Sequence, residues 1–127
     1  MIQQLKNYIA GEWQQSKTTD YLEVINPATS GVLTEVPLSL ADDLDQAVAA
    51  ADNAFTTWRR IPPTERVQYL FKLKTLLEQH REELAKITTA ECGKTLKESQ
   101  GELQRAIENV EVACGIPTSM QGYNSED

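Results

Sequence analysis

The spacing of apolar residues changes once along the chain, near Pro37. Before Pro37, short runs rich in β-branched and aromatic residues alternate with turn-forming residues, which is typical of strands and hairpins. After it, apolar residues recur every three or four positions and so share one helical face. The pattern predicts an α+β fold that is mainly helical, with hairpins over residues 1–37, helices over 38–117 and a frayed polar tail over 118–127.

Two short hairpins are expected in the first segment. Gly11 lies in the turn of the first, between Ile9 and Trp13, because glycine adopts the positive φ that a tight hairpin turn needs. The second hairpin pairs residues 21–25 with residues 32–36 across the turn sequence Asn-Pro-Ala-Thr-Ser-Gly, in which the glycine closes the turn.

The first helix is expected from about Leu40 to Thr57. Ser39 and Asp42 fit a capping box at its start. In such a box the Ser39 oxygen accepts from a free backbone amide of the first turn, and the Asp42 side chain, three residues later, accepts from the Ser39 amide. The apolar stripe of this helix consists of Leu44, Val48, Ala51, Phe55 and Trp58.

A long second helix is expected to begin near Pro63, because the amide that proline lacks would be unpaired in a first turn. The pattern predicts an interruption near His80 and a C-terminal cap at Gly93. The apolar stripe consists of Val67, Leu70, Phe71, Leu77, Leu84 and Ile87.

Thr95 and Glu98 repeat the capping-box pattern and start a third helix. Gly115, followed two residues later by Pro117, is a typical stop signal for it. The apolar stripe consists of Leu103, Ile107, Val110 and Cys114.

Composition and charge narrow the choice of compartment and partners. The 127 residues fit one domain, with 12 Lys and Arg against 19 Asp and Glu and a formal net charge of -7. That average field disfavours nucleic acid and anionic membranes. Because no apolar run approaches the roughly 18 residues of a membrane span and no signal peptide is evident, we expect a cytoplasmic chain. Its two cysteines fit a reducing compartment.

The cysteines and the histidine offer little catalytic chemistry. Cys114 lies at the negative end of a helix dipole, which opposes thiolate formation, and it is in phase with the apolar stripe, so we interpret it as a core residue. Cys92 ends a helix in the same way and is interpreted as a structural or semi-exposed thiol; a thiol sensor is the alternative. Leu77 stands three residues before His80, so the Glu-x-x-His spacing of di-iron bundles is absent.

The acidic clusters are interpreted as solvated helix faces. They are Glu78, Glu82 and Glu83 in one helix and Asp42, Asp43 and Asp45 in another. The chain has no Gly-x-Gly-x-x-Gly, phosphate-loop or Gly-x-Ser-x-Gly sequence. The sequence therefore predicts no catalytic, cofactor-binding or metal-ligating residue.

Four stretches, in this order and spacing, resemble the amino-terminal part of the aldehyde dehydrogenase superfamily. They are YIAGEW, VINPATSGVLTEVPLS, the helical run from AVAAADNAF to ECGKTL, and GELQRAIENVEVACGIP. The VEVACGIP stretch and Gly122 are most similar to methylmalonate-semialdehyde dehydrogenases. Two positions depart from the family pattern. Ser30 stands at a glycine position, so we expect the register of the turn to shift, and Cys92 stands where asparagine or threonine is usual.

The resemblance implies the outer part of a cofactor-binding domain without its Rossmann sheet, in a family that uses NAD and, in this class, coenzyme A. The family's nucleophilic cysteine, pyrophosphate-binding unit and oligomerisation strands lie beyond the matched region, so neither Cys92 nor Cys114 inherits a role. We therefore expect a truncated amino-terminal fragment or excised domain that is inactive alone. We also expect it to form a homo-oligomer through exposed apolar helix faces. The alternative is an interaction module that binds a full-length dehydrogenase subunit.

Overall fold

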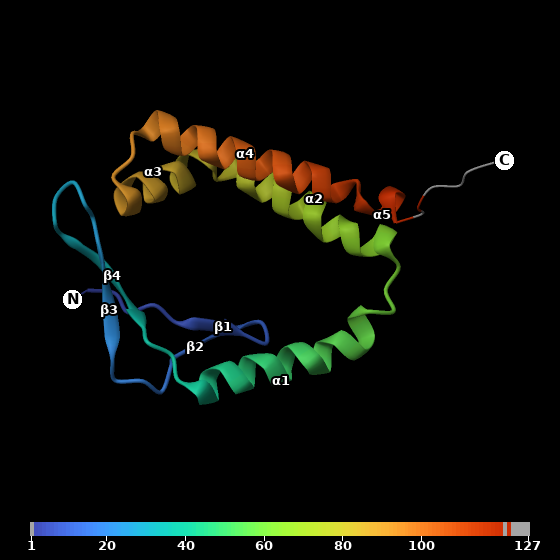
Figure 1. The fold of residues 1–127 in the computed structure, drawn as a ribbon, viewed down its shortest axis with the longest axis horizontal. Coiled ribbons are helices and arrows are strands. Elements are labelled where there is room, and N and C mark those ends of the chain that lie inside the picture. Colours follow the sequence, from blue (N-terminus) through green and yellow to red (C-terminus); the bar gives the residue numbers. More distant parts are fainter. Residues whose placement is uncertain (1, 121, 123–127) are drawn as a thin grey trace. The chain divides into compact units, whose positions relative to one another are not determined.

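A computed structural model describes residues 2–120 and 122 of the chain (Figure 1). The elements are β1 (Asn7–Ile9), β2 (Glu12–Gln14), β3 (Tyr21–Ile25), β4 (Val32–Pro37), α1 (Ala41–Trp58), α2 (Pro63–Gln79), α3 (Arg81–Cys92), α4 (Leu96–Cys114) and α5 (Ile116–Ser119). They form two compact units, residues 1–60 with 90–93, and residues 61–89 with 94–127. The predicted α+β fold, mainly helical with amino-terminal hairpins, is confirmed.

In the first unit, β1 and β2 form an antiparallel hairpin in which Tyr8 lies opposite Trp13. Their ring centroids are 4.9 Å apart. Both turn residues have positive φ, 54° for Ala10 and 86° for Gly11, which is the requirement of a type I′ turn. The hairpin was therefore predicted correctly, but alanine also adopts the left-handed conformation that the sequence assigned to glycine alone.

Strands β3 and β4 pair antiparallel, with a register irregularity between Val24 and Ile25. The connecting turn begins with the Asn26 side chain, whose Oδ1 accepts from the Ala28 amide at 2.9 Å. Ser30, rather than Gly31, adopts positive φ, at 59°. The serine at the family's glycine position thus takes the conformation that usually favours glycine.

The start of α1 differs from the prediction. Leu40 is the N-cap residue, and the Asp43 carboxylate, not that of Asp42, accepts from the Leu40 amide at 3.0 Å. The Ser39 hydroxyl instead hydrogen-bonds the side chain of Asn7, with 2.9 Å between Ser39 Oγ and Asn7 Nδ2. The predicted capping box is therefore wrong by one residue, because a residue distant in sequence engages the serine.

The glycine cap predicted at Gly93 is confirmed. Gly93 follows the last residue of α3 with φ of 68°. A Cβ built at this position would lie 2.7 Å from Cγ of Pro27, which belongs to the same unit. Both the left-handed backbone and this close approach require glycine.

In the second unit, α2 and α4 lie side by side and run antiparallel (Figure 1). Val67 of α2, Ala85 of α3 and Ile107 of α4 are buried. The buried Ser99 hydroxyl hydrogen-bonds Thr89 at 2.9 Å. Pro63 at the start of α2 and the break at His80 are confirmed.

Helix α4 has the predicted capping box. The Glu98 amide donates to Thr95 Oγ1 at 3.3 Å, and the Thr95 amide donates to Glu98 Oε2 at 2.9 Å. The helix ends at Cys114, as predicted, but α5 then adds a short helix that reaches Ser119, beyond the expected start of the frayed tail. The tail prediction for residues 121 and 123–127 lies outside the described residues.

Candidate functional site

An exposed apolar helix face of the first unit lies on α1. Val48 is 58% exposed and Phe55 is 54% exposed, and Leu44 is more exposed still. These residues share one helical face, as their spacing predicted. A face of this kind marks a binding surface more often than a site of chemistry.

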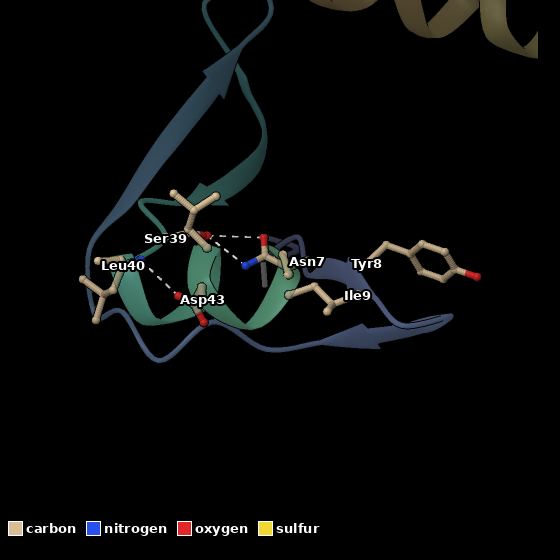
Figure 2. Close-up of a pocket in the computed structure, with 9 residues that line it drawn as sticks. Asn7, Tyr8, Ile9, Ser39, Leu40 and Asp43 are labelled. Atoms are coloured by element: carbon tan, nitrogen blue, oxygen red, sulfur yellow. Dashed lines mark hydrogen bonds between the residues drawn. The ribbon is translucent and has the colours of Figure 1, made fainter. Parts of the chain in front are cut away.

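A pocket of about 500 Å³ lies in the first unit beside the start of α1 (Figure 2). Its lining consists of Asn7, Tyr8, Ile9, Ser39, Leu40, Ala41, Asp43, Leu44 and Ala47. Figure 2 shows that the polar groups of this lining pair with one another, while the ring of Tyr8 points away from them. The pocket therefore presents few free hydrogen-bonding groups to a ligand.

Asp43 is the most heavily engaged acid of this region, with 7% of its surface exposed. Its Oδ2 accepts from Ser16 Oγ at 2.6 Å and from the Leu40 amide at 3.0 Å. The hydrogen bond from Ser16, followed by that from Leu40, lowers the pKa of the Asp43 carboxyl below its ordinary value. Ser16 also accepts from the Thr18 amide at 3.2 Å, so one small network joins the segment after β2 to the start of α1.

This network was not found in the sequence. Asp43 was interpreted as part of a solvated acidic cluster with Asp42 and Asp45, and that interpretation is wrong for Asp43 because Ser16 and Leu40 enclose its carboxylate. The position of Asp43 three residues after Leu40 was an available signal for its cap role. Its partner Ser16 lies 27 residues away in sequence and had no local signal.

The structure does not gather the other candidate residues into a catalytic arrangement. Cys92 is exposed and Cys114 is half-buried. His80 Nδ1 lies 3.0 Å from Glu83 Oε2 on the exposed surface. Neighbouring lysines pair with the remaining acids of this cluster, Glu78 with Lys74 at 2.7 Å and Glu82 with Lys86 at 2.8 Å. The ion pair with Lys86 lowers the pKa of the Glu82 carboxyl.

Within residues 2–120 and 122, no group of three or more histidine, cysteine, aspartate or glutamate side chains is placed to hold a metal ion. Among the same residues, none of the helices combines the length and the apolar character that crossing a bilayer requires.

The pocket beside α1 does not fit the pyrophosphate of a dinucleotide. A helix N-terminus attracts phosphate because its first amides are free and its dipole is positive there. In α1 the Asp43 carboxylate already accepts from the Leu40 amide and brings a negative charge to this end. The hydrogen bonds of Asp43 hold the segment after β2 against the start of α1. The exposed apolar face of α1 is suited to binding another protein surface.

Comparison with known proteins gives one consistent match. The sequence model of the aldehyde dehydrogenase family matches residues 13–126. The malonate-semialdehyde dehydrogenase of Listeria monocytogenes serotype 4a (strain HCC23) is 52% identical over 121 residues, which cover 95% of this chain and 25% of that protein. This chain therefore spans about a quarter of the length of such a relative.

Solved structures agree with the sequence match. The methylmalonate-semialdehyde dehydrogenase from Oceanimonas doudoroffii superposes with a TM-score of 0.91 at 38% identity, over 98% of this chain and 25% of that one. A variant of aldehyde dehydrogenase C from Pseudomonas syringae, in complex with NAD+ and octanal, gives a TM-score of 0.89 at 31% identity, over 97% of this chain and 26% of that one. The hairpins and helices are thus arranged as in part of these larger enzymes.

Proposed function

Because the chain belongs to the aldehyde dehydrogenase family, we propose that it serves as the amino-terminal scaffold of an NAD-dependent dehydrogenase of the malonate- or methylmalonate-semialdehyde type. The 52% identity to a malonate-semialdehyde dehydrogenase over 95% of the chain is the observation that carries this proposal. The scaffold would hold its helices against the remainder of such an enzyme, and we propose that this remainder uses NAD and coenzyme A.

By itself this chain is proposed to be inactive as a dehydrogenase. Aldehyde oxidation by this chemistry needs an activated thiol beside a bound nicotinamide. Cys92 is exposed on the surface, and Cys114 is half-buried at the end of α4. The Asp43 carboxylate beside the α1 pocket supports this proposal, because its negative charge disfavours a phosphate group there.

A chimeric enzyme tests the scaffold role. In the Listeria relative, this chain replaces the matched amino-terminal portion, and NADH formation from malonate semialdehyde and coenzyme A is measured. We expect the chimera to keep dehydrogenase activity, a matched deletion of that portion to abolish it, and the isolated chain to show none. NADH formation by the isolated chain would contradict the proposal that the chain alone is inactive. A folded but inactive chimera would contradict the scaffold role.

The exposed face of α1 favours a second candidate function, self-association or binding to a full-length dehydrogenase subunit. Large exposed apolar residues on one helical face are usually covered in an assembly. Two copies of α1, packed through Leu44, Val48 and Phe55, would remove this face from water in a homo-oligomer. We propose this homo-oligomer as the form of the isolated chain, and we propose that it is cytoplasmic.

Sedimentation equilibrium with and without NAD tests self-association. We expect an oligomer that NAD does not change and that Val48→Lys shifts toward monomer, because a charge then enters the apolar face. Asn53→Lys adds the same charge to another side of α1 and is expected to leave the oligomer intact. A monomer in the unsubstituted chain would contradict self-association, and a monomer stabilised by NAD would reveal a nucleotide site.

A further inference from the structure

The outer edge of β3 is an open strand edge within the first unit. β3 pairs with β4 on one side only. The Leu38 amide donates to the Asp20 carbonyl at 2.9 Å at the end of the ladder. Asp20 and Leu38 are therefore a hydrogen-bonded pair, and hydrogen-bonded and non-hydrogen-bonded pairs alternate along an antiparallel ladder. Glu23 and Glu35 lie three pairs further along, so they are a non-hydrogen-bonded pair. The backbone amide and carbonyl of both residues therefore point away from the ladder, and those of Glu23 reach the open edge.

The opposite edge of this sheet shows what such an edge binds. The Glu35 amide donates to the Gln3 carbonyl at 3.0 Å, and the Leu5 amide donates to the Glu35 carbonyl at 2.8 Å. An extended segment is thus added to β4 in parallel. Gln4 Nε2 donates to Glu35 Oε2 at 3.0 Å, so the added segment also supplies a donor for the carboxylate.

Glu23 has no equivalent of Gln4. It lies directly opposite Glu35, in the kind of pair where side chains approach most closely, and two like charges there repel each other. Within residues 2–120 and 122, no side chain forms an ion pair or hydrogen bond with the exposed Glu23 carboxylate. The open edge therefore combines free backbone groups with an uncompensated negative charge.

We propose that the outer edge of β3 binds an extended polypeptide strand that places a lysine or arginine beside Glu23. The backbone of this strand would pair with the outward amide and carbonyl of Glu23, and its cation would relieve the repulsion between Glu23 and Glu35. Side chains next to the cation would fall on the other face of the sheet, beside Leu22, which is 61% exposed, and Val24. Apolar β-branched residues suit those positions.

A second copy of β3 fits this edge poorly. Pairing two β3 strands edge to edge would form one continuous sheet that contains Glu23 and Glu35 from each copy. When the two β3 strands pair antiparallel, all four carboxylates would lie on the same face, because the two-fold axis of such a pair is perpendicular to the sheet and each Glu23 shares a face with the Glu35 opposite it. Charge thus favours a partner strand with a cationic residue over self-pairing.

A peptide titration of the full chain tests the proposal. The probe is the capped peptide Thr-Val-Lys-Val-Thr, and the matched control replaces its lysine by glutamate. NMR amide shifts are recorded on the 15N-labelled chain at up to about 1 mM peptide. We expect shifts concentrated in residues 21–25 and roughly threefold to tenfold tighter binding of the lysine peptide, since a cross-strand charge pair changes its sign.

Variants of the chain separate edge recognition from nonspecific attraction. Glu23→Lys is expected to reverse the preference and bind the glutamate peptide more tightly. Glu23→Gln is expected to remove the preference, and it serves if the lysine variant does not fold. Glu12→Lys, which makes the same change at an exposed glutamate of β2, is expected to leave the preference unchanged.

Three results would overturn the proposal. The first is an absence of shifts in residues 21–25 over the whole titration. The second is equal binding of the lysine and glutamate peptides by the unsubstituted chain. The third is a concentration-dependent shift of β3 amides without peptide, which would indicate that a second copy occupies the edge.

Discussion

Helices α1 and α4 have the same sequence design but different surroundings. Each carries an apolar stripe at steps of three and four residues. In α4 the stripe residue Ile107 is 2% exposed, with α2 packed beside the helix. In α1 the stripe residues Val48 and Phe55 remain more than half exposed. The apolar stripe therefore identifies the face of a helix that is suited to burial. Whether that face is buried depends on a neighbouring element that packs against it.

The N-termini of α4 and α1 also differ, in whether nearby or distant residues form their hydrogen bonds. Helix α4 begins with a reciprocal capping box between Thr95 and Glu98, both of which lie within the helix's own first turn. The start of α1 depends on distant residues, because Ser16 bonds the cap residue Asp43 and Asn7 bonds Ser39. Helix α4 is thus specified locally and α1 by tertiary contacts, and three substitutions can break or sharpen this contrast.

The largest effect is expected from Ile107→Ala in α4. Removing a buried isoleucine side chain leaves a cavity and costs about 2–5 kcal/mol of the free energy of unfolding. The matched change Val48→Ala on the exposed face of α1 should stay within about 0.5 kcal/mol at protein concentrations low enough to keep the chain monomeric. Urea unfolding followed by circular dichroism measures both variants. Similar losses in the monomer would contradict the contrast, and a Val48→Ala loss that grows with protein concentration would support burial of the α1 face in the proposed oligomer.

An intermediate effect is expected from Thr95→Ala. The variant loses the side-chain oxygen that accepts from the Glu98 amide, which costs about 1 kcal/mol at an N-cap. Ser39→Ala is the matched control at the start of α1, where the hydroxyl bonds Asn7 rather than a helix amide. Its loss should be smaller, because the bond it removes is solvent-exposed. Thermal unfolding compares the stability of the two variants. A larger loss of stability in Ser39→Ala than in Thr95→Ala would indicate that Ser39 caps α1.

Local chemistry explains why much of the fold was predictable. The positive φ of Gly11 and Gly93, the imino acid Pro63 and the Thr95 capping pattern all act within a few residues, so the sequence around them specifies turns and helix ends. The break at His80 was likewise visible in the pattern. Helix and strand boundaries consequently fall within one or two residues of those predicted.

Long-range pairings explain what the sequence did not reveal. The side chain of Ser39 fits a cap by its type and position, but Asn7, 32 residues away, engages it. The capping role then falls to Asp43, whose partner Ser16 is equally remote. The parallel addition of Gln4 beside Glu35 also joins segments 31 residues apart. A single sequence carries no signal for such pairs, because each residue also fits a local role.

The smallest effect is expected from Asp43→Asn, since the remaining carbonyl oxygen can accept from both Ser16 and Leu40, which bond the same carboxylate oxygen. Only the charge at the start of α1 is lost. The pKa of the Asp43 carboxyl is lowered in the folded chain, so its stabilisation is present above the ordinary value of 3.8 and is lost as the pH falls through the lowered pKa.

The stability difference between the unsubstituted chain and Asp43→Asn should therefore be present at neutral pH and vanish in acid. Urea unfolding at a series of pH values measures it, with Asp45→Asn as a control at an exposed acid of the same helix. A difference that does not change with pH would mean that the carboxylate of Asp43 acts by shape and not by charge. The start of α1 would then depend on hydrogen-bond geometry and not on the charge of Asp43.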